Sequence, residues 1–211
     1  MENKIISNYL SIQDNLSPNI KIIAVSKTFE LSKIKPLIDH GHDHFGENKL
    51  QEAQFKWSET IKINKSIKLH MIGKLQSNKA KKAVELFHYI HSLDNQKLSD
   101  ALSKAEKEKN KKLNYFIQVN IGNEPQKSGI SVNDLPSFFK YCTIENKLKV
   151  IGLMVLPPQD KKDNYFLKIQ NLNNSLNLKE LSMGMSSDYL DALNYGATYI
   201  RIGSSIFGSR S

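Results

Sequence analysis

KIIAVSK, residues 21–27, holds four consecutive apolar residues and ends on a lysine. A short apolar run rich in β-branched residues and bounded by polar sequence is typical of a buried strand. SKIKPLIDHG, residues 32–41, follows and is predicted to form a helix ending at Gly41, because glycine is common just past a helix C-terminus. The two segments make the first strand–helix unit of the chain.

The same order of a short apolar segment and a longer amphipathic segment recurs along the chain. Strands that alternate with helices predict a parallel sheet with helical crossovers. We expect further strands within residues 43–48, 68–73, 89–94, 113–121, 149–156, 180–184 and 198–203. We expect further helices at about residues 2–16, 51–57, 77–87, 96–109, 132–141 and 188–195, and a short turn at 204–207.

Eight strand–helix units favour a closed (β/α)8 barrel, the TIM barrel, in which residues 1–211 form a single α/β domain. The chain of 211 residues is shorter than the roughly 250 residues typical of this barrel, so its loops must be short. An open α/β sheet is the alternative, because weak strands can be miscounted.

The composition bounds the class of protein. With 39% hydrophobic residues, the chain can bury a core, and no stretch approaches the roughly 20 apolar residues that span a bilayer. The N-terminal segment is too polar for a signal peptide. A single cysteine, Cys142, excludes an internal disulfide framework. We therefore expect a cytoplasmic protein without a membrane partner. We also expect a monomer.

The net charge of +9 raises the question of nucleic-acid binding, because clustered lysines can neutralise phosphates. The lysines are spread along the chain, and no zinc-finger spacing or aromatic RNA-binding signature accompanies them. We therefore expect no nucleic-acid partner. His40, His42 and His44 alternate on a turn-rich segment without a cysteine nearby, and we expect no metal site.

Lys27 follows the first expected strand, at the end where functional residues of this barrel lie. Desolvation and nearby cations at a barrel mouth can lower the pKa of a lysine. The neutral amine so formed can attack an aldehyde and give a Schiff base. A solvated lysine on a surface loop is the alternative interpretation.

The eighth expected strand and its exit contain a second group of candidates. Successive backbone N–H groups at Gly203 and Ser204 can point at an anion, and the hydroxyls of Ser204 and Ser182 can add donors. A simple helix N-cap at Ser204 or Ser205 is compatible with this. Arg201 must find a ligand or a partner at the mouth, and a salt bridge to Glu47 is the alternative.

Seven motifs occur along the chain in a fixed order. They are AVSKT (24–28), FGEN (45–48), HMIGKLQSNK (70–79), KSGI (127–130), GLMVLPP (152–158), SMGMSSD (182–188) and RIGSSIFGSR (201–210). In type and order they resemble the motifs of the YggS/PROSC family, the pyridoxal 5'-phosphate (PLP) homeostasis proteins. The resemblance covers essentially the whole chain and implies a barrel similar to those of alanine racemase and eukaryotic ornithine decarboxylase.

The resemblance implies a role in PLP binding for six residues. Lys27 matches the lysine that forms the internal aldimine, and Asn48 matches an asparagine beside the cofactor ring. Ser182 matches a phosphate-binding serine. Gly203 and Ser204 match the phosphate-binding turn, and Arg201 matches the arginine at the pyridine nitrogen. Family members often carry a second lysine two residues after the first, where this chain has Phe29.

The residue types favour binding over catalysis. Arginine only donates hydrogen bonds, so Arg201 would leave the pyridine nitrogen unprotonated and the ring a poor electron sink. Racemisation needs a second base, which alanine racemase takes from a partner subunit and an additional β domain for which this chain has no room. We expect a PLP carrier, not an enzyme, that buffers the cofactor or delivers it to PLP-dependent apoenzymes. The alternative is an amino-acid racemase of low activity.

Overall fold

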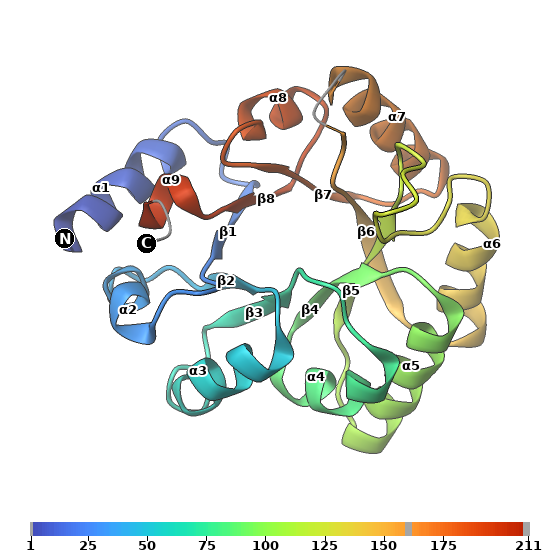
Figure 1. Cartoon of the computed structure of the whole chain (residues 1–211), viewed down its shortest axis with the longest axis horizontal. Coiled ribbons are helices and arrows are strands. Elements are labelled where there is room, and N and C mark those ends of the chain that lie inside the picture. The colour runs from blue at the N-terminus through green and yellow to red at the C-terminus, as the bar shows by residue number, and fades with distance from the viewer. Residues whose placement is uncertain (1, 159–161, 209–211) are drawn as a thin grey trace.

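The computed structural model describes residues 2–158 and 162–208 of the chain (Figure 1). Parallel strands pair in chain order, and β8 pairs with β1, so the sheet closes into a barrel. The predicted (β/α)8 barrel is therefore confirmed. Its strands are β1 (Lys21–Val25), β2 (His44–Glu47), β3 (Lys68–Met71), β4 (Tyr89–Leu93), β5 (Asn114–Val119), β6 (Lys149–Val155), β7 (Glu180–Met185) and β8 (Tyr199–Ile202).

Helices form a ring around the strands (Figure 1). None of the helices within the described ranges is long and apolar enough to cross a membrane. The helices are α1 (Glu2–Gln13), α2 (Leu31–Asp39), α3 (Leu50–Ile63), a 3-10 turn η1 (Ser77–Lys79), α4 (Ala80–Leu86), α5 (Gln96–Lys109), α6 (Leu135–Lys140), a π-helical turn η2 (Tyr141–Glu145), α7 (Lys162–Ser175), α8 (Tyr189–Asn194) and α9 (Ser204–Phe207).

Helix α7 is an element for which the sequence analysis gave no bounds. Its sequence contains four asparagines, which have a low helix propensity, and this obscures the apolar periodicity. Packing compensates for the composition, because Phe166 and Ile169 are fully buried. The buried Asn173 also accepts a hydrogen bond from the Leu153 N–H, which ties the helix to β6.

The interior of the barrel differs from the layer between strands and helices. The outer layer is a continuous apolar core that includes Trp57 and Phe87. Inside the ring of strands lies a smaller apolar cluster of Ile23, Phe116, Met154 and Tyr199. The polar side chains of His70, His91 and Ser182, from β3, β4 and β7, are also fully buried. Branched aliphatic side chains usually dominate this space, so its polar content needs a structural explanation.

Candidate functional site

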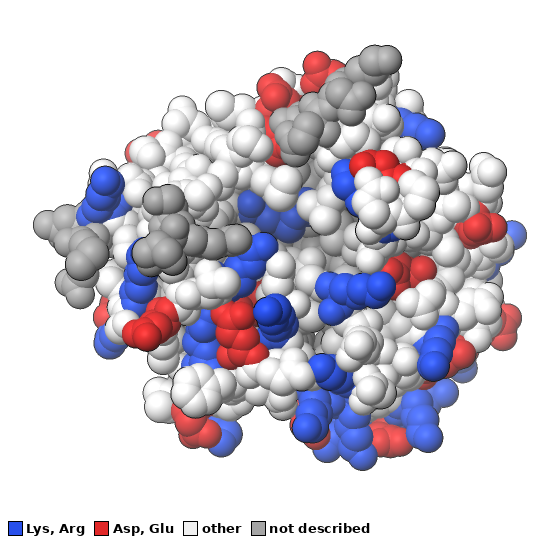
Figure 2. All heavy atoms as spheres, in the orientation of Figure 1, with Lys and Arg blue, Asp and Glu red and all other residues white. Residues whose placement is uncertain are grey.

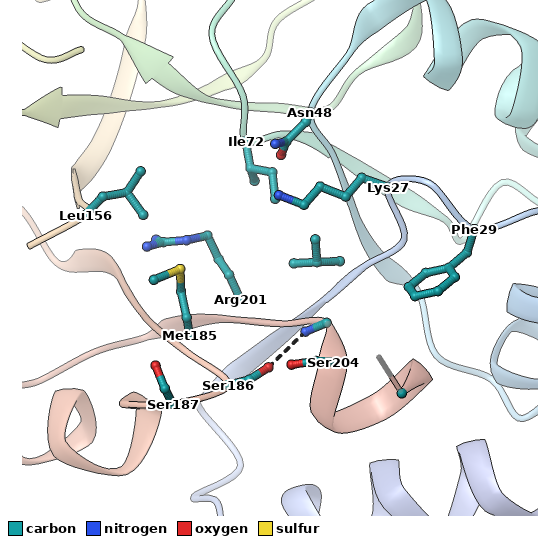
Figure 3. Close-up of a pocket in the computed structure, with 13 residues that line it drawn as sticks. Lys27, Phe29, Asn48, Ile72, Leu156, Met185, Ser186, Ser187, Arg201 and Ser204 are labelled. Carbon is teal, nitrogen blue, oxygen red and sulfur yellow. Dashed lines mark hydrogen bonds between the residues drawn. The ribbon is translucent and has the colours of Figure 1, made fainter. Parts of the chain in front are cut away.

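A cavity of about 500 Å³ opens at the end of the barrel where the strands terminate. This volume falls within the range of small-molecule sites, and the lining comes from the ends of six different strands and the segments that follow them. Figure 3 shows these side chains converging on one space. The lining residues are Val25, Lys27, Phe29, Asn48, Ile72, Leu156, Met185, Ser186, Ser187, Arg201, Gly203, Ser204 and Gly208.

Lys27 lies in the turn that follows β1, and its amine extends into the cavity beside Asn48 and Ile72 (Figure 3). The turn is held in place on both sides of the lysine. The Ser26 N–H donates to the Gly46 carbonyl over 3.0 Å, and the Thr28 N–H donates to the Glu52 carboxylate. Thr28 adopts a φ of 68°, which is uncommon for a residue with a branched side chain. These contacts fix the direction in which the lysine leaves the strand.

Glu47, at the end of β2, is fully buried and binds residues other than Arg201. Its Oε1 accepts hydrogen bonds from Ser26 Oγ at 2.7 Å, Lys56 Nζ at 2.9 Å and Trp57 Nε1 at 2.9 Å. The ion pair that the sequence left open for Glu47 and Arg201 is therefore replaced by a Glu47–Lys56 pair. Arg201 is left to other partners and to the cavity.

Arg201, on β8, contributes its guanidinium to the cavity while its side chain is buried. Nη1 donates to Ser182 Oγ over 2.7 Å, and Nη2 donates to the Val155 carbonyl over 2.9 Å. Burial lowers the pKa of Arg201 to about 10, and the nearby Asp188 carboxylate opposes that shift. The guanidinium therefore remains charged at neutral pH and can only donate hydrogen bonds.

Ser182 lies outside the cavity lining, in contrast to the other predicted site residues. It is fully buried, and its hydroxyl contacts Arg201 and His91 Nδ1, the latter at 2.9 Å. The reason is a bulge in β7: Ser182 pairs with Tyr199, yet Met185 pairs with Arg201, so β7 has one extra residue. The bulge brings Ser186 and Ser187 to the cavity, two residues that the sequence analysis missed.

The signal for this bulge is Gly184, a glycine inside a strand. It has a φ of +88°, and a Cβ atom there would lie 2.9 Å from the Ala192 Cβ of α8. A side chain at this position would be strained and would collide with the helix. The glycine therefore permits both the bulge and the close approach of α8.

The β8 exit forms a turn of backbone N–H groups around Ser186. The N–H groups of Gly203 and Ser205 donate to Ser186 Oγ over 3.3 and 3.4 Å, and Figure 3 marks the first of these bonds. Gly203 is the N-cap residue of α9. The N-cap that the sequence left open for Ser204 or Ser205 is thus occupied by Gly203, and these N–H groups face the cavity edge with Ser186.

Asn48 follows β2 and is positioned by the exit of β3. Gly73 runs so close to it that a Cβ atom on Gly73 would lie 2.3 Å from the Asn48 carbonyl oxygen. Any larger residue at position 73 would displace the Asn48 backbone. Asn48 also lines an adjoining cavity of about 240 Å³, together with Lys74 and Lys127.

The site is cationic. Lys27 and Arg201 line the main cavity, whose described lining contains no aspartate, glutamate, histidine or tyrosine. In Figure 2, Lys and Arg side chains surround a hollow near the centre of the visible face. Among the described residues no group of three His, Cys, Asp or Glu side chains is arranged to hold a metal ion. The geometry suits an anionic ligand with a group that can react with an amine.

A comparison with family models matches residues 2–211 to the family described as alanine racemase, N-terminal domain. A pyridoxal phosphate homeostasis protein of Synechocystis is 38% identical, over 97% of this chain and 98% of that protein. A protein of the same name from Schizosaccharomyces pombe is 34% identical, over 91% of this chain and 85% of that protein.

Solved structures agree with these matches. PipY of Synechococcus elongatus with PLP bound superposes with a TM-score of 0.90 at 34% identity, covering 97% of this chain and 100% of PipY. An alanine racemase of Clostridium difficile superposes with a TM-score of 0.77 at 13% identity, covering 99% of this chain but 57% of the racemase. The racemase shares the barrel alone.

Proposed function

The chain belongs to the family of the pyridoxal phosphate homeostasis proteins, which carry the alanine racemase N-terminal domain, and from this premise we propose that residues 1–211 form one PLP-binding domain that buffers the cofactor and delivers it to apoenzymes. The observation that carries the proposal is the cavity that gathers Lys27, Arg201 and the Gly203–Ser204 turn around one space. PLP binding by the similar PipY supports it.

The residues present fit PLP at each of its functional groups. Lys27, whose amine lines the cavity, would hold PLP through the cofactor's aldehyde, with which a lysine amine can condense to a Schiff base and release water. The N–H groups of the Gly203–Ser204 turn suit a phosphate, and the Ser186 hydroxyl takes the place next to them that the sequence analysis assigned to Ser182. Arg201 would donate to the pyridine nitrogen, and Asn48 would lie beside the ring, since both residues line the same cavity.

We propose that the protein is not an enzyme. A donor-only Arg201 at the pyridine nitrogen does not protonate it, which leaves the ring a poor acceptor of electrons from a substrate carbanion. Racemisation also needs a second base opposite the lysine. The described lining of the cavity offers Lys27 as its base and no histidine, tyrosine or carboxylate that could serve as the second.

The proposal also covers location and partners. We propose a cytoplasmic protein, because the chain's one cysteine, Cys142, is buried in the core and allows no internal disulfide framework. Recipients of the cofactor are PLP-dependent apoenzymes. The adjoining cavity and the open mouth leave the amine side of the site accessible to them.

Reduction of the PLP-loaded protein tests the covalent link. We expect borohydride to fix a pyridoxyl group on Lys27, located by peptide mass spectrometry, because the Lys27 amine is the one directed into the cavity. Lys127→Ala, which removes a lysine of the adjoining cavity, is the control and should leave the adduct in place. An adduct mainly on another lysine at saturating PLP would refute the assignment.

Exchange of amino-acid α-protons in D₂O, followed by NMR, tests the absence of turnover. With PLP-saturated protein, we expect alanine, serine and glutamate to exchange no faster than with free PLP, because the described lining of the cavity holds no second base. Exchange at an enzyme-like rate of about 1 s⁻¹ or more, lost in Lys27→Ala, would instead establish the racemase alternative.

A further inference from the structure

A row of hydrogen-bonded side chains crosses the interior of the barrel beneath the cavity. It begins at Arg201, whose Nη1 contacts Ser182 Oγ at 2.7 Å, and continues from Ser182 Oγ to His91 Nδ1 at 2.9 Å. His91 Nε2 contacts His70 Nδ1 at 2.9 Å, and His70 Nε2 contacts His44 Nδ1 at 2.8 Å. Five strands thus contribute one side chain each to a single connected row.

Burial makes the row more than a chance alignment. Ser182, His70 and His91 are fully buried, where an unpaired polar group would be costly. Aromatic rings hold the imidazoles in place: Tyr89 stacks on His70 with ring centroids 4.2 Å apart, and Phe116 stacks on His91 at 4.3 Å. The imidazole planes are therefore fixed, and each nitrogen faces one partner.

The direction of the row follows from its cationic end. Arginine can only donate, so Ser182 Oγ accepts from Arg201 and its own proton must go to an acceptor. Among the hydrogen bonds of the described residues, the one acceptor it meets is His91 Nδ1. Because His91 Nδ1 accepts this hydrogen bond, His91 carries its own proton on Nε2 and donates to His70 Nδ1. By the same logic His70 carries its proton on Nε2 and donates to His44 Nδ1.

The far end of the row completes the pattern. His44 carries its remaining proton on Nε2, which lies 3.8 Å from Asp43 Oδ1 at the opposite end of the barrel. Burial and the nearby Lys21 and Lys68 ammonium groups lower the pKa of His44, while Asp43 opposes that shift. Burial also places the pKa values of His70 and His91 well below their usual range. All three rings are therefore neutral at pH 7, which is required if every hydrogen bond of the row donates in the same direction.

We infer that His44, His70 and His91 are positioning residues of the cofactor site, acting through Ser182 to fix the Arg201 guanidinium at the cavity. The hydrogen-bonded row directs a lone pair of Ser182 Oγ toward Arg201 and directs the Ser182 hydroxyl proton toward His91. With the opposite direction, Ser182 would accept from both neighbours and its proton would lack the partner it has now. The inference rests on the proposed function where it names PLP as the ligand, whereas the donor direction of the row is a property of the protein alone.

The ligand-free protein tests the direction. In long-range ¹H–¹⁵N correlation spectra of ¹⁵N-labelled protein, we expect the Nε2–H tautomer for His44, His70 and His91. The resonances are assigned by single substitutions of each histidine. A stable Nδ1–H tautomer at His70 or His91 would reverse the donor direction of the row and overturn the inference, whether or not the protein binds PLP.

Substitutions at His70 test the link to the site, because His70 does not line the cavity. His70→Leu interrupts the hydrogen-bonded row, and we expect PLP to bind about threefold to tenfold more weakly, as the loss of one hydrogen bond implies. His70→Gln should restore binding to within about twofold, since its amide can accept from His91 and donate to His44 with the same direction. His88→Leu, which removes a histidine that is not part of the hydrogen-bonded row, is the matched control.

The outcomes separate the inference from the function on which it rests. Equal PLP affinities for His70→Leu, His70→Gln and His88→Leu would reduce the histidines to structural residues and overturn the inference. If His70→Leu does not fold, the wild-type tautomers decide. A wild type that binds no PLP would refute the proposed function and leave the tautomer measurement standing.

Discussion

Arg201 is the residue on which the proposed preference for binding over catalysis most depends. Its guanidinium is committed to Ser182 and Val155 and still lines the cavity, so it can orient a ring nitrogen without exchanging a proton with it. A carboxylate at the same place would favour a protonated ring and the chemistry that follows from it. Under the proposed function, this side chain would favour binding over turnover.

Arg201→Ala should weaken PLP binding while the covalent link to Lys27 remains, because no atom of that link is removed. We expect a loss of roughly 1.5–3 kcal/mol, the worth of a hydrogen bond to a charged group. PLP titration gives the affinity, and reduction with mass spectrometry reports the adduct. The PLP affinity of Arg201→Lys should lie between those of the wild type and Arg201→Ala, because lysine keeps the charge but lacks the planar guanidinium. A folded Arg201→Ala protein without an adduct at saturating PLP would contradict this.

Sequence position was informative for residues at the end of a regular strand or directly after it. Lys27, Asn48, Arg201, Gly203 and Ser204 were all predicted, and all line one cavity. Their placement was predictable because the exits of parallel strands meet at one end of a barrel. Their roles toward PLP remain proposals.

Ser182 shows why the remainder of the site was not predictable at the level of residues. Strict alternation along β7 directs Ser182 inward, and it does point inward, but one layer below the cavity. The extra residue at the bulge then brings Ser186 to the lining. The depth of a side chain inside a barrel depends on strand register, which the sequence alone does not reveal.

At the level of elements, the bulged end of β7 and the start of α9 form one unit. Neither could hold an anion alone, because α9 spans only Ser204–Phe207 and its first N–H groups need a partner. Ser186 provides that partner in the ligand-free protein. A bound phosphate would join the same group of donors.

Ser186→Ala should narrow the difference in affinity between PLP and pyridoxal, which lacks the phosphate. We expect PLP to bind more weakly by roughly 1.5–3 kcal/mol, as for one lost hydrogen bond to a charged group. Pyridoxal should be nearly unaffected. Titrations with both compounds measure the difference, and Ser137→Ala, an exposed serine on α6, serves as control. Equal losses for PLP and pyridoxal would place the phosphate elsewhere.

The order and type of the elements were largely predictable, whereas their bounds were not. Helix α3 continues to Ile63, six residues beyond the predicted end at Trp57, because nothing local stops it before Asn64. Helix α7 received no bounds, since its periodicity is weak and its stability comes from contacts made in the folded barrel. The sequence motifs had identified the family, and the comparisons with known proteins confirmed it.

At the level of the whole molecule, the buried neutral histidines tie stability to pH. Burial lowers the pKa of His42 and of His88 to about 4, and it also lowers those of His44, His70 and His91. In the unfolded chain these groups take up protons near a pKa of about 6.5. The unfolded state therefore binds more protons than the folded state once the pH falls below that value.

The free energy of unfolding should accordingly be constant above about pH 7 and fall as the pH drops from about 6.5 toward 5. Each histidine contributes at most about 1.4 kcal/mol per pH unit within this window. Urea unfolding at a series of pH values measures the slope, and His42→Gln should reduce it by one histidine's share. A flat profile between pH 7 and 5 would mean that the histidines take up protons equally in the folded and unfolded states, contrary to the lowered pKa values.

The pairing of β1 with β8 has a consequence for how the protein is made. Ile23 and Arg201 are register partners, yet almost the whole chain separates them, so their contact is among the last that a folding chain can form. During synthesis Lys27 leaves the ribosome early, whereas Arg201 and Gly203 follow only near the end. A nascent chain therefore exposes Lys27 before the β8 side of the cavity exists, and under the proposed function the cofactor site would be complete only when the ring of strands closes.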